Sequence, residues 1–176
     1  MINGIPINGI QSTGAESKLV SSKPVELSVD LRRCEVLNAS DPGSLAAVLQ
    51  GGGELSSDCD EQLLITVAFT TPVKLFSISV KAPANAPSEL HLFSNRTSMA
   101  FEDAEGMPPT QTIALTSTHV AGTPVPVQYV KFQNVSTLSI FIPSNQEETD
   151  VTTLHQLRFD GHPIATTNMS ELKKMG

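Results

Sequence analysis

The feature that most constrains the fold is a series of short β-type segments with almost no helix between them. Each is rich in Val, Ile, Leu, Phe and Thr, and each is bounded by Pro, Gly, Asn or Asp. Parallel strands need long crossover connections, so this order predicts antiparallel pairing. We expect at least seven strands, in EQLLITVAF, PVKLFSISVK, ELHLFSN, QTIALTS, QYVKFQN, TLSIFIP and VTTLHQLRFDG.

Side chains alternate within two of these segments, which predicts strands with two distinct faces. In the first segment, one face is predicted to carry Leu75, Ser77 and Ser79, and the other Phe76, Ile78 and Val80. In the second, one face is predicted to carry Leu138, Ile140 and Ile142, and the other Ser139 and Phe141. The pattern favours an all-β fold, a jelly-roll β-sandwich, and the absence of a 20–50 residue repeat argues against a propeller.

One or two short helical segments are predicted on the N-terminal side of the strands, one of them in DPGSLAAVLQGGG. Asp41 is the expected N-cap, Leu45, Val48 and Leu49 share a face, and Gly51 is the expected stop. The three glycines lack the Lys-Ser/Thr of a phosphate loop, so they predict a flexible joint. Residues 1–25, rich in Gly, Ser, Asn and Pro, are predicted to be a flexible segment or linker, and residues 26–176 a single domain.

The charge and hydropathy patterns exclude several classes of partner. The net charge is -7 and the basic residues are scattered, so neither nucleic acid nor an anionic membrane is an expected partner. No apolar run approaches the roughly 20 residues of a spanning helix, and no signal-peptide pattern is present. We expect a cytoplasmic monomer, with the nucleus as a second compartment, in which Cys34 and Cys59 are reduced thiols.

No catalytic constellation is apparent. The sequence has no Gly-x-Ser-x-Gly, Cys-x-x-Cys or His-Glu-x-x-His motif, and its four histidines are spread singly. We therefore expect no enzyme activity, no cofactor and no bound metal. Acidic runs such as Glu147-Glu148 are typical of solvated loops, and loop oxygens forming a weak hard-cation site are the alternative.

Several blocks, in order, resemble the PITH domain, the proteasome-interacting module also found C-terminal to a thioredoxin-like domain. The blocks are CEVLNASDPGSLAAVL, LSSDCDEQLLITVAFTTPVKLFSISV, MAFEDAEGMPPTQTIAL, YVKFQNVSTLSIFIPSNQEE and FDGHPIATTNMSELKK. His162 and Leu172 depart from the family pattern, in which Thr and an aromatic residue are frequent. The resemblance implies a galactose-binding-like jelly roll that binds the proteasome regulatory particle without catalysis, with an upstream thioredoxin domain as a further partner in a longer chain. A carbohydrate- or small-ligand-binding module is the alternative, although its aromatic platform is poorly supplied, with Tyr129 the one Tyr and no Trp.

Ten residues in predicted loops form the candidate partner-binding set, because loops on a rigid scaffold commonly carry binding residues. They are Asp58, Asp60, Asn95, Met99, Phe101, Asp103, Gln133, Asn134, Asn145 and Gln146. The amides have an alternative role in turn chemistry, and Met99 and Phe101 have one in core packing. The hypothesis requires that two or more of these loops share one rim of the sandwich.

Overall fold

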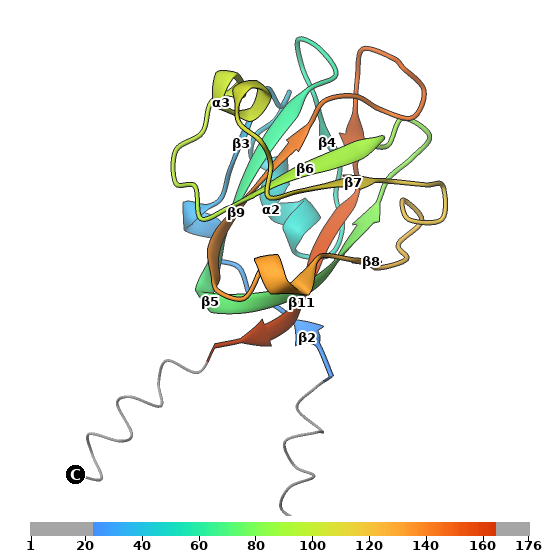
Figure 1. The fold of residues 1–176 in the computed structure, drawn as a ribbon. Helices are drawn as coiled ribbons and strands as arrows, with labels where there is room; N and C mark the ends of the chain where they lie inside the picture. Colours follow the sequence, from blue (N-terminus) through green and yellow to red (C-terminus); the bar gives the residue numbers. More distant parts are fainter. Residues whose placement is uncertain (1–22, 165–176) are drawn as a thin grey trace, which may run out of the picture.

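The structure, a computed structural model, describes residues 23–164, and their strands form a curled antiparallel sheet (Figure 1). The eight-stranded sheet has the order β2-β11-β5-β9-β6-β7, with β3 and β8 also paired to β5, and β4 and β10 form a separate pair. The strands are β2 (Val25–Glu26), β3 (Glu35–Leu37), β4 (Leu55–Ser56), β5 (Leu63–Lys81), β6 (Glu89–Ser94), β7 (Gln111–Ala114), β8 (Val125–Pro126), β9 (Val135–Ile142), β10 (Thr153–Leu154) and β11 (Gln156–Pro163).

The helical elements are short. They are η2 (Leu31–Arg33), α2 (Ser44–Leu49), α3 (Phe101–Gly106) and η3 (Tyr129–Lys131). The predicted all-β class with short N-terminal helical segments is confirmed. The predicted flexible segment 1–25 lies almost wholly outside the described residues, as does the TTNMSELKK part of the tail.

Strand β5 passes through both halves of the molecule, which corrects the prediction of two separate strands there. Its first part pairs with β9 from Leu63 to Ala68, and its second part pairs with β11 from Val73 to Lys81. The register with β9 shifts between Ala68 and Val73, a stretch that includes Pro72, which has no N–H to donate to a ladder. Figure 1 shows β5 curving through the lower end of the molecule at this point.

A β-bulge in the second half of β5 overturns the predicted alternation. Leu75 pairs with Gly161 and Ser77 with Asp160, so Phe76 is an extra residue on β5. The insertion places Leu75 on the same buried face as Ile78, where simple alternation put them on opposite faces. Phe76 is left half-buried on the outer side.

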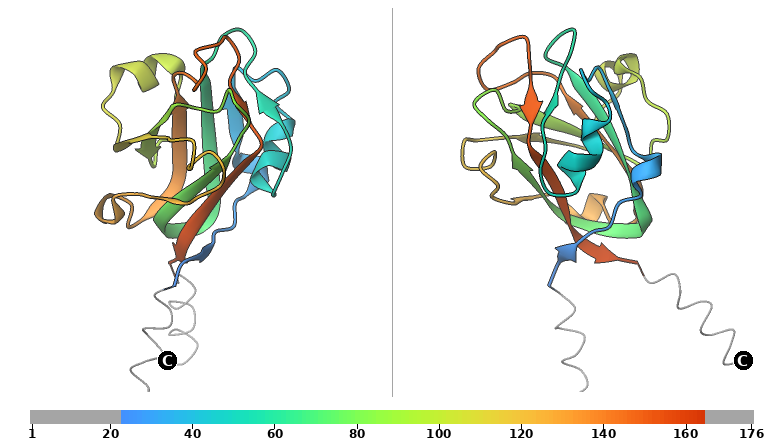
Figure 2. Two further views of the ribbon diagram at one scale, coloured as in Figure 1. Left: turned by 90° about the vertical axis from the view of Figure 1, so that its right-hand side faces the viewer. Right: turned by 180° about the vertical axis from the view of Figure 1, so that it is seen from behind.

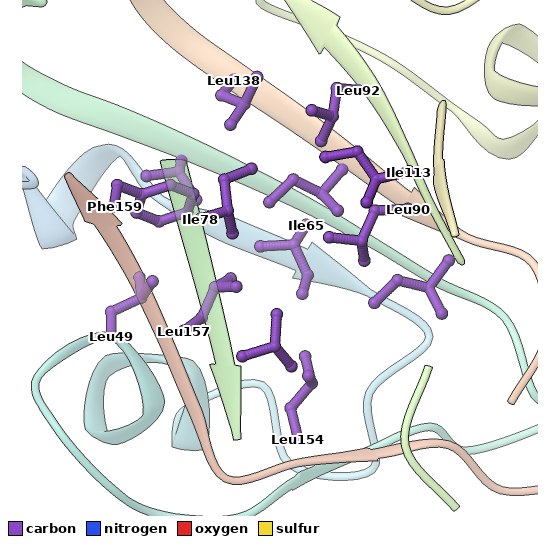
Figure 3. Packing of buried hydrophobic residues seen from close by; sticks show 14 of the residues in the cluster. Leu49, Ile65, Ile78, Leu90, Leu92, Ile113, Leu138, Leu154, Leu157 and Phe159 are labelled. Atoms are coloured by element: carbon purple, nitrogen blue, oxygen red, sulfur yellow. The ribbon is translucent and has the colours of Figure 1, made fainter. Parts of the chain in front are cut away.

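The main core fills the space enclosed by the curled sheet. Side chains from β5, β6, β7, β9 and β11 meet there, together with Leu49 of α2 (Figure 3). Seen from behind, α2 lies beside β11 (Figure 2, right), and its predicted face of Leu45, Val48 and Leu49 is buried. Burial of each such side chain is worth about 1.5–3 kcal/mol, so this packing orients the strands and their loops.

A second apolar cluster covers the other face of β5, β9 and β6. It contains Leu64, Phe93, Met99, Ala104 and Phe141. The predicted placement of Leu138, Ile140 and Ile142 on the face opposite Phe141 is confirmed. The three aliphatic residues lie in the main core, and Phe141 lies in the second cluster. Strand β9 is therefore buried on both faces, and α3 covers the outer one.

Three further local predictions were wrong. QYVKFQN was predicted as a strand, but it forms the turn η3 and leads into β9. VTTLHQLRFDG divides into β10 and β11. Helix α2 begins after Gly43 rather than Asp41, whose carboxylate instead accepts from the Gly43 N–H at 3.2 Å. Gly51 does follow the helix, at a φ of 127° that favours glycine.

Gly161→Ala is expected to destabilise the fold. A Cβ at Gly161 would collide with the backbone carbonyl of Lys74, which the ladder holds in place. The expected loss of unfolding free energy is roughly 1–3 kcal/mol, typical of overpacking. Urea unfolding measures it. The matched control is Gly106→Ala, where a Cβ meets no atom within 4 Å and the change should stay within about 0.5 kcal/mol. Equal midpoints for the two variants would contradict this account.

Candidate functional site

The loop before β5 uses one of its predicted acidic residues to hold itself closed. Asn38 donates to the Asp60 carboxylate at 2.8 Å and to the Gln62 carbonyl at 2.6 Å, and it accepts from the Cys59 N–H at 3.0 Å. The φ of Asn38 is 69°, a left-handed value that Asn tolerates better than most residues. Asp58 is exposed, and its carboxylate makes no hydrogen bond to a described residue.

Asn145 is the organising residue of the loop after β9. Its side chain is buried, with the residue 2% exposed, and its amide donates to the carbonyls of Thr149 and Val151 and to the Thr152 hydroxyl. Its Oδ1 accepts from the N–H groups of Glu147 and Thr149 at 3.1 and 3.0 Å. These contacts are turn chemistry at full capacity, because both ends of the amide are satisfied within the loop.

Gln146 connects this loop to two others. Its Nε2 donates to the carbonyls of Pro87 and Leu115, each at 2.9 Å, and its backbone N–H donates to the Ala86 carbonyl at 2.7 Å. The residue is nevertheless exposed at the surface. Its amide therefore secures the loop, while the neighbouring Glu147 projects into solvent.

Asn95, Gln133 and Asn134 lie at the opposite end of β9. The Asn95 amide donates to the Asn134 carbonyl at 2.9 Å and accepts from the Ser136 N–H at 2.8 Å, which joins the end of β6 to the start of β9. Gln133 donates to the Tyr129 carbonyl at 3.1 Å. The side chain of Asn134 makes no hydrogen bond to a described residue and is exposed.

The remaining candidates belong to helix α3 and its approach. Asp103 accepts from the Ala100 N–H at 2.9 Å and so caps the helix. Met99 is buried in the second apolar cluster, which agrees with the alternative of core packing. Phe101 is half-buried and contacts Phe141 edge-on at 6.0 Å. Phe101 and Asp103 were expected in a loop, and the cap and apolar contacts explain why a helix forms instead.

The ten predicted residues therefore fall into two groups. Thr152, held by Asn145, donates to the Glu61 carbonyl at 2.6 Å, so the loops with Asp58, Asp60, Asn145 and Gln146 meet at the upper end (Figure 1). Gln62 donates to Glu105 at 3.3 Å and brings α3 to the same end. Asn95, Gln133 and Asn134 are separated from this upper rim by the length of β9. A partner-binding role for either group stays a prediction.

Sequence reasoning missed an exposed apolar patch formed by Phe76, Tyr129, Val130 and His162. Tyr129 packs edge-on against Phe76 at 4.6 Å, and His162 does so at 4.8 Å from the other strand. Tyr129 is 38% exposed and Val130 is 79% exposed. The patch could not be predicted because the composition of QYVKF is typical of a strand, and because Phe76 faces outward only as a result of the bulge.

Metal-ligating side chains do not cluster within residues 23–164. No group of three or more His, Cys, Asp or Glu there is placed to hold a metal ion. His91 pairs with Glu89 at 2.7 Å, and the Nδ1 of His119 accepts from the Thr116 N–H at 3.1 Å.

None of the helices formed by residues 23–164 has the length and apolar character needed to span a membrane.

Comparison with known sequences decides the family, because the PITH domain family model matches residues 16–176. The chain belongs to the PITH domain family. This PITH domain is 34% identical over 170 residues to thioredoxin-like protein 1 of Schizosaccharomyces pombe, covering 88% of the chain and 59% of that protein. It is 34% identical over 128 residues to PITH domain-containing protein 1 of Homo sapiens, covering 68% of the chain and 60% of that protein. The chain thus spans about three fifths of the length of these relatives.

Solved structures confirm the jelly-roll, galactose-binding-like prediction for this PITH domain. CBM32-3 of a family 31 glycoside hydrolase from Clostridium perfringens has a TM-score of 0.52 and 14% identity, covering 84% of this chain and 97% of that chain. The family 32 module of C. perfringens NanJ, solved with galactose, has a TM-score of 0.55 and 8% identity, covering 77% and 99%. At such identities the likeness concerns the fold alone. The PITH family relatives carry no enzyme activity in their names, and no catalytic family is indicated.

Asn145→Ala is expected to lower the unfolding free energy by roughly 2–4 kcal/mol, because it leaves several loop N–H and carbonyl groups without their partner. Asn134→Ala removes an exposed side chain with no described hydrogen bond and should change stability by less than about 0.5 kcal/mol. Chemical denaturation of both variants measures the difference. A neutral Asn145→Ala would show that the buried amide does not organise the loop.

The two thiols are expected to react at different rates. Burial raises the pKa of the Cys34 thiol, although a hydrogen bond from the Ala68 N–H opposes the rise, whereas Cys59 is exposed. Because the thiolate is the nucleophile, alkylation of Cys34 at mildly alkaline pH should be at least about tenfold slower than that of Cys59. A mass-spectrometric time course with iodoacetamide measures both. The rates should converge in denaturant, and equal rates in the native state would refute the assignment.

Proposed function

We propose that this PITH domain is a non-catalytic interaction module that binds the proteasome regulatory particle. Its expected setting is the cytoplasm, with the nucleus as a second compartment, and its expected state is a monomer. The partner is suggested by the ordered sequence blocks that resemble the family, and family membership supports that resemblance. In a longer chain, an upstream thioredoxin domain would supply redox chemistry, because this sequence has no Cys-x-x-Cys.

The single observation that carries an interaction role is the apolar patch. Val130 is 79% exposed at the tip of η3, and the adjacent Tyr129 ring rests on Phe76. Phe76 and His162 stand on paired strands, so the patch has a rigid base. An exposed aromatic and aliphatic pair on a rigid base is typical of an interface anchor, since little conformational entropy is lost when it is covered.

The acidic upper rim is a second surface with a different part in association. Glu147, Glu148 and Asp150 are exposed, and no described Lys or Arg forms a salt bridge with them. At low salt the charges of such a loop act over roughly 10–30 Å and accelerate encounter with a basic surface. The alternative role of these charges is to keep an edge strand from pairing with other chains.

A pull-down from reducing cytosolic lysate, read by quantitative mass spectrometry, tests the proposal with the full chain and Val130→Asp. The wild type should enrich regulatory-particle subunits, and Val130→Asp should reduce that enrichment by at least about tenfold, because a charge would be buried in the interface. Val151→Asp is the matched control, since Val151 is 39% exposed on the loop after β9.

The outcomes separate the surfaces and the competing functions. Loss with Val151→Asp and with charge reversal at Glu147 and Glu148, but not with Val130→Asp, would transfer the interface to the upper rim. Absence of regulatory-particle subunits from the wild-type eluate would overturn the proposed partner. Saturable binding of galactose at Tyr129 in that case would favour the carbohydrate-binding alternative suggested by the fold.

A further inference from the structure

A polar cleft of about 320 Å³ lies on the outer face of the β5–β11 ribbon. Its floor is formed by Ser79 and Lys81 of β5, and one wall by Gln156 and Arg158 of β11, which pair with those residues in register. The other wall is the segment around Gly122, beside the isolated bridge between Lys81 and Ala121. None of these residues belongs to the candidate set from the sequence.

An ion pair fixes one end of the cleft. Arg158 directs both Nε and an Nη at the same Asp160 oxygen, each at 3.0 Å, and Asp160 is only 8% exposed. The pair is local to β11, two residues apart on the same side of the strand. The pair offsets the charge of the Asp160 carboxylate.

Lys81 also lines the cleft, and its aliphatic stem lies beside Gly122. The glycine at 122, with a φ of 115°, leaves space for the Lys81 stem, because a Cβ there would lie 2.9 Å from its Cε. Among residues 23–164, none forms a hydrogen bond or salt bridge with the Lys81 Nζ, and the side chains of Ser79 and Gln156 are likewise without hydrogen bonds. Three groups able to donate therefore line one cleft.

The charge balance selects the class of ligand. Among the residues that line the cleft, Lys81 and Arg158 contribute two positive charges and Asp160 one negative charge, so the lining carries one net positive charge, while Glu26 lies near Arg158 outside the lining. Asp160 and the nearby Glu26 disfavour a dianion such as phosphate. A monoanion that accepts several hydrogen bonds, namely a carboxylate, fits this arrangement.

We propose that the cleft binds a carboxylate of a partner peptide, held by Lys81 with Gln156 and Ser79 as further donors. Arg158, Asp160 and His162 alternate along one side of β11, so the apolar patch follows the cleft along this strand. A peptide with an acidic group beside an apolar side chain spans both surfaces. The inference rests on the proposed function only in taking the ligand to be part of a partner protein.

Amide chemical-shift titrations of the full chain test the proposal with three peptides whose N-termini are blocked. One carries an internal Glu and an amidated end, one is Gly-only with a free C-terminal carboxylate, and one is the neutral Gln, amidated counterpart. At least one carboxylate peptide should shift the amides of Lys81, Gly122 and Arg158, with a dissociation constant on the order of millimolar, the strength of a single charge-assisted contact. Comparison of the first two distinguishes a side-chain carboxylate from a chain terminus.

Lys81→Gln should weaken carboxylate binding by about tenfold, whereas Arg96→Gln, the same loss of charge on an exposed loop, should leave it unchanged. The proposal is overturned if the neutral peptide binds equally, if the shifts fall elsewhere, if Lys81→Gln has no effect, or if inorganic phosphate binds more tightly than either carboxylate peptide. The peptide titration contains no proteasome. A pull-down that fails while peptide binding is intact would therefore count against the proposed partner and not against the cleft.

Discussion

The structure depends on one strand, β5, which takes part in both layers of the sandwich. Its first half pairs with β9 and its second with β11, and the register break around Pro72 lets the chain curve between them. The first half of β5 contributes Ile65 to the main core, and the second half contributes Ile78 to the same core (Figure 3). Hydrogen bonding on both sides of one strand makes the two layers a single cooperative unit.

The bulge at Phe76 links this architecture to the surface. One additional residue keeps Leu75 in the core and turns Phe76 out, where η3 and His162 pack against it. Beyond the bulge, ordinary alternation resumes and sends Ser79 and Lys81 to the outer face as the floor of the polar cleft. The apolar patch and the cleft are thus neighbours because they share two paired strands.

The sequence predicted the architecture well because strand composition and turn residues are local signals. It predicted the buried face of α2 and the two faces of β9 for the same reason. It did not predict the bulge, since Phe76 to Val80 alternate regularly in sequence and the extra residue is defined only by the pairing of Leu75 with Gly161 and of Ser77 with Asp160. The amides show a related limit: Asn145 and Asn134 have the same composition signal, but only the tertiary structure reveals that one is buried and the other exposed.

The pairing of β2 with β11 has a mechanical consequence. Val25 lies opposite Gly161 and Glu26 opposite Asp160, so the chain enters and leaves the ladder at the same end (Figure 1). A force that separates the two chain ends therefore loads these hydrogen bonds one pair at a time, as in opening a zipper, rather than all together in shear. These two pairs are therefore the first to open when a flanking domain or a processive unfolding machine pulls on both ends.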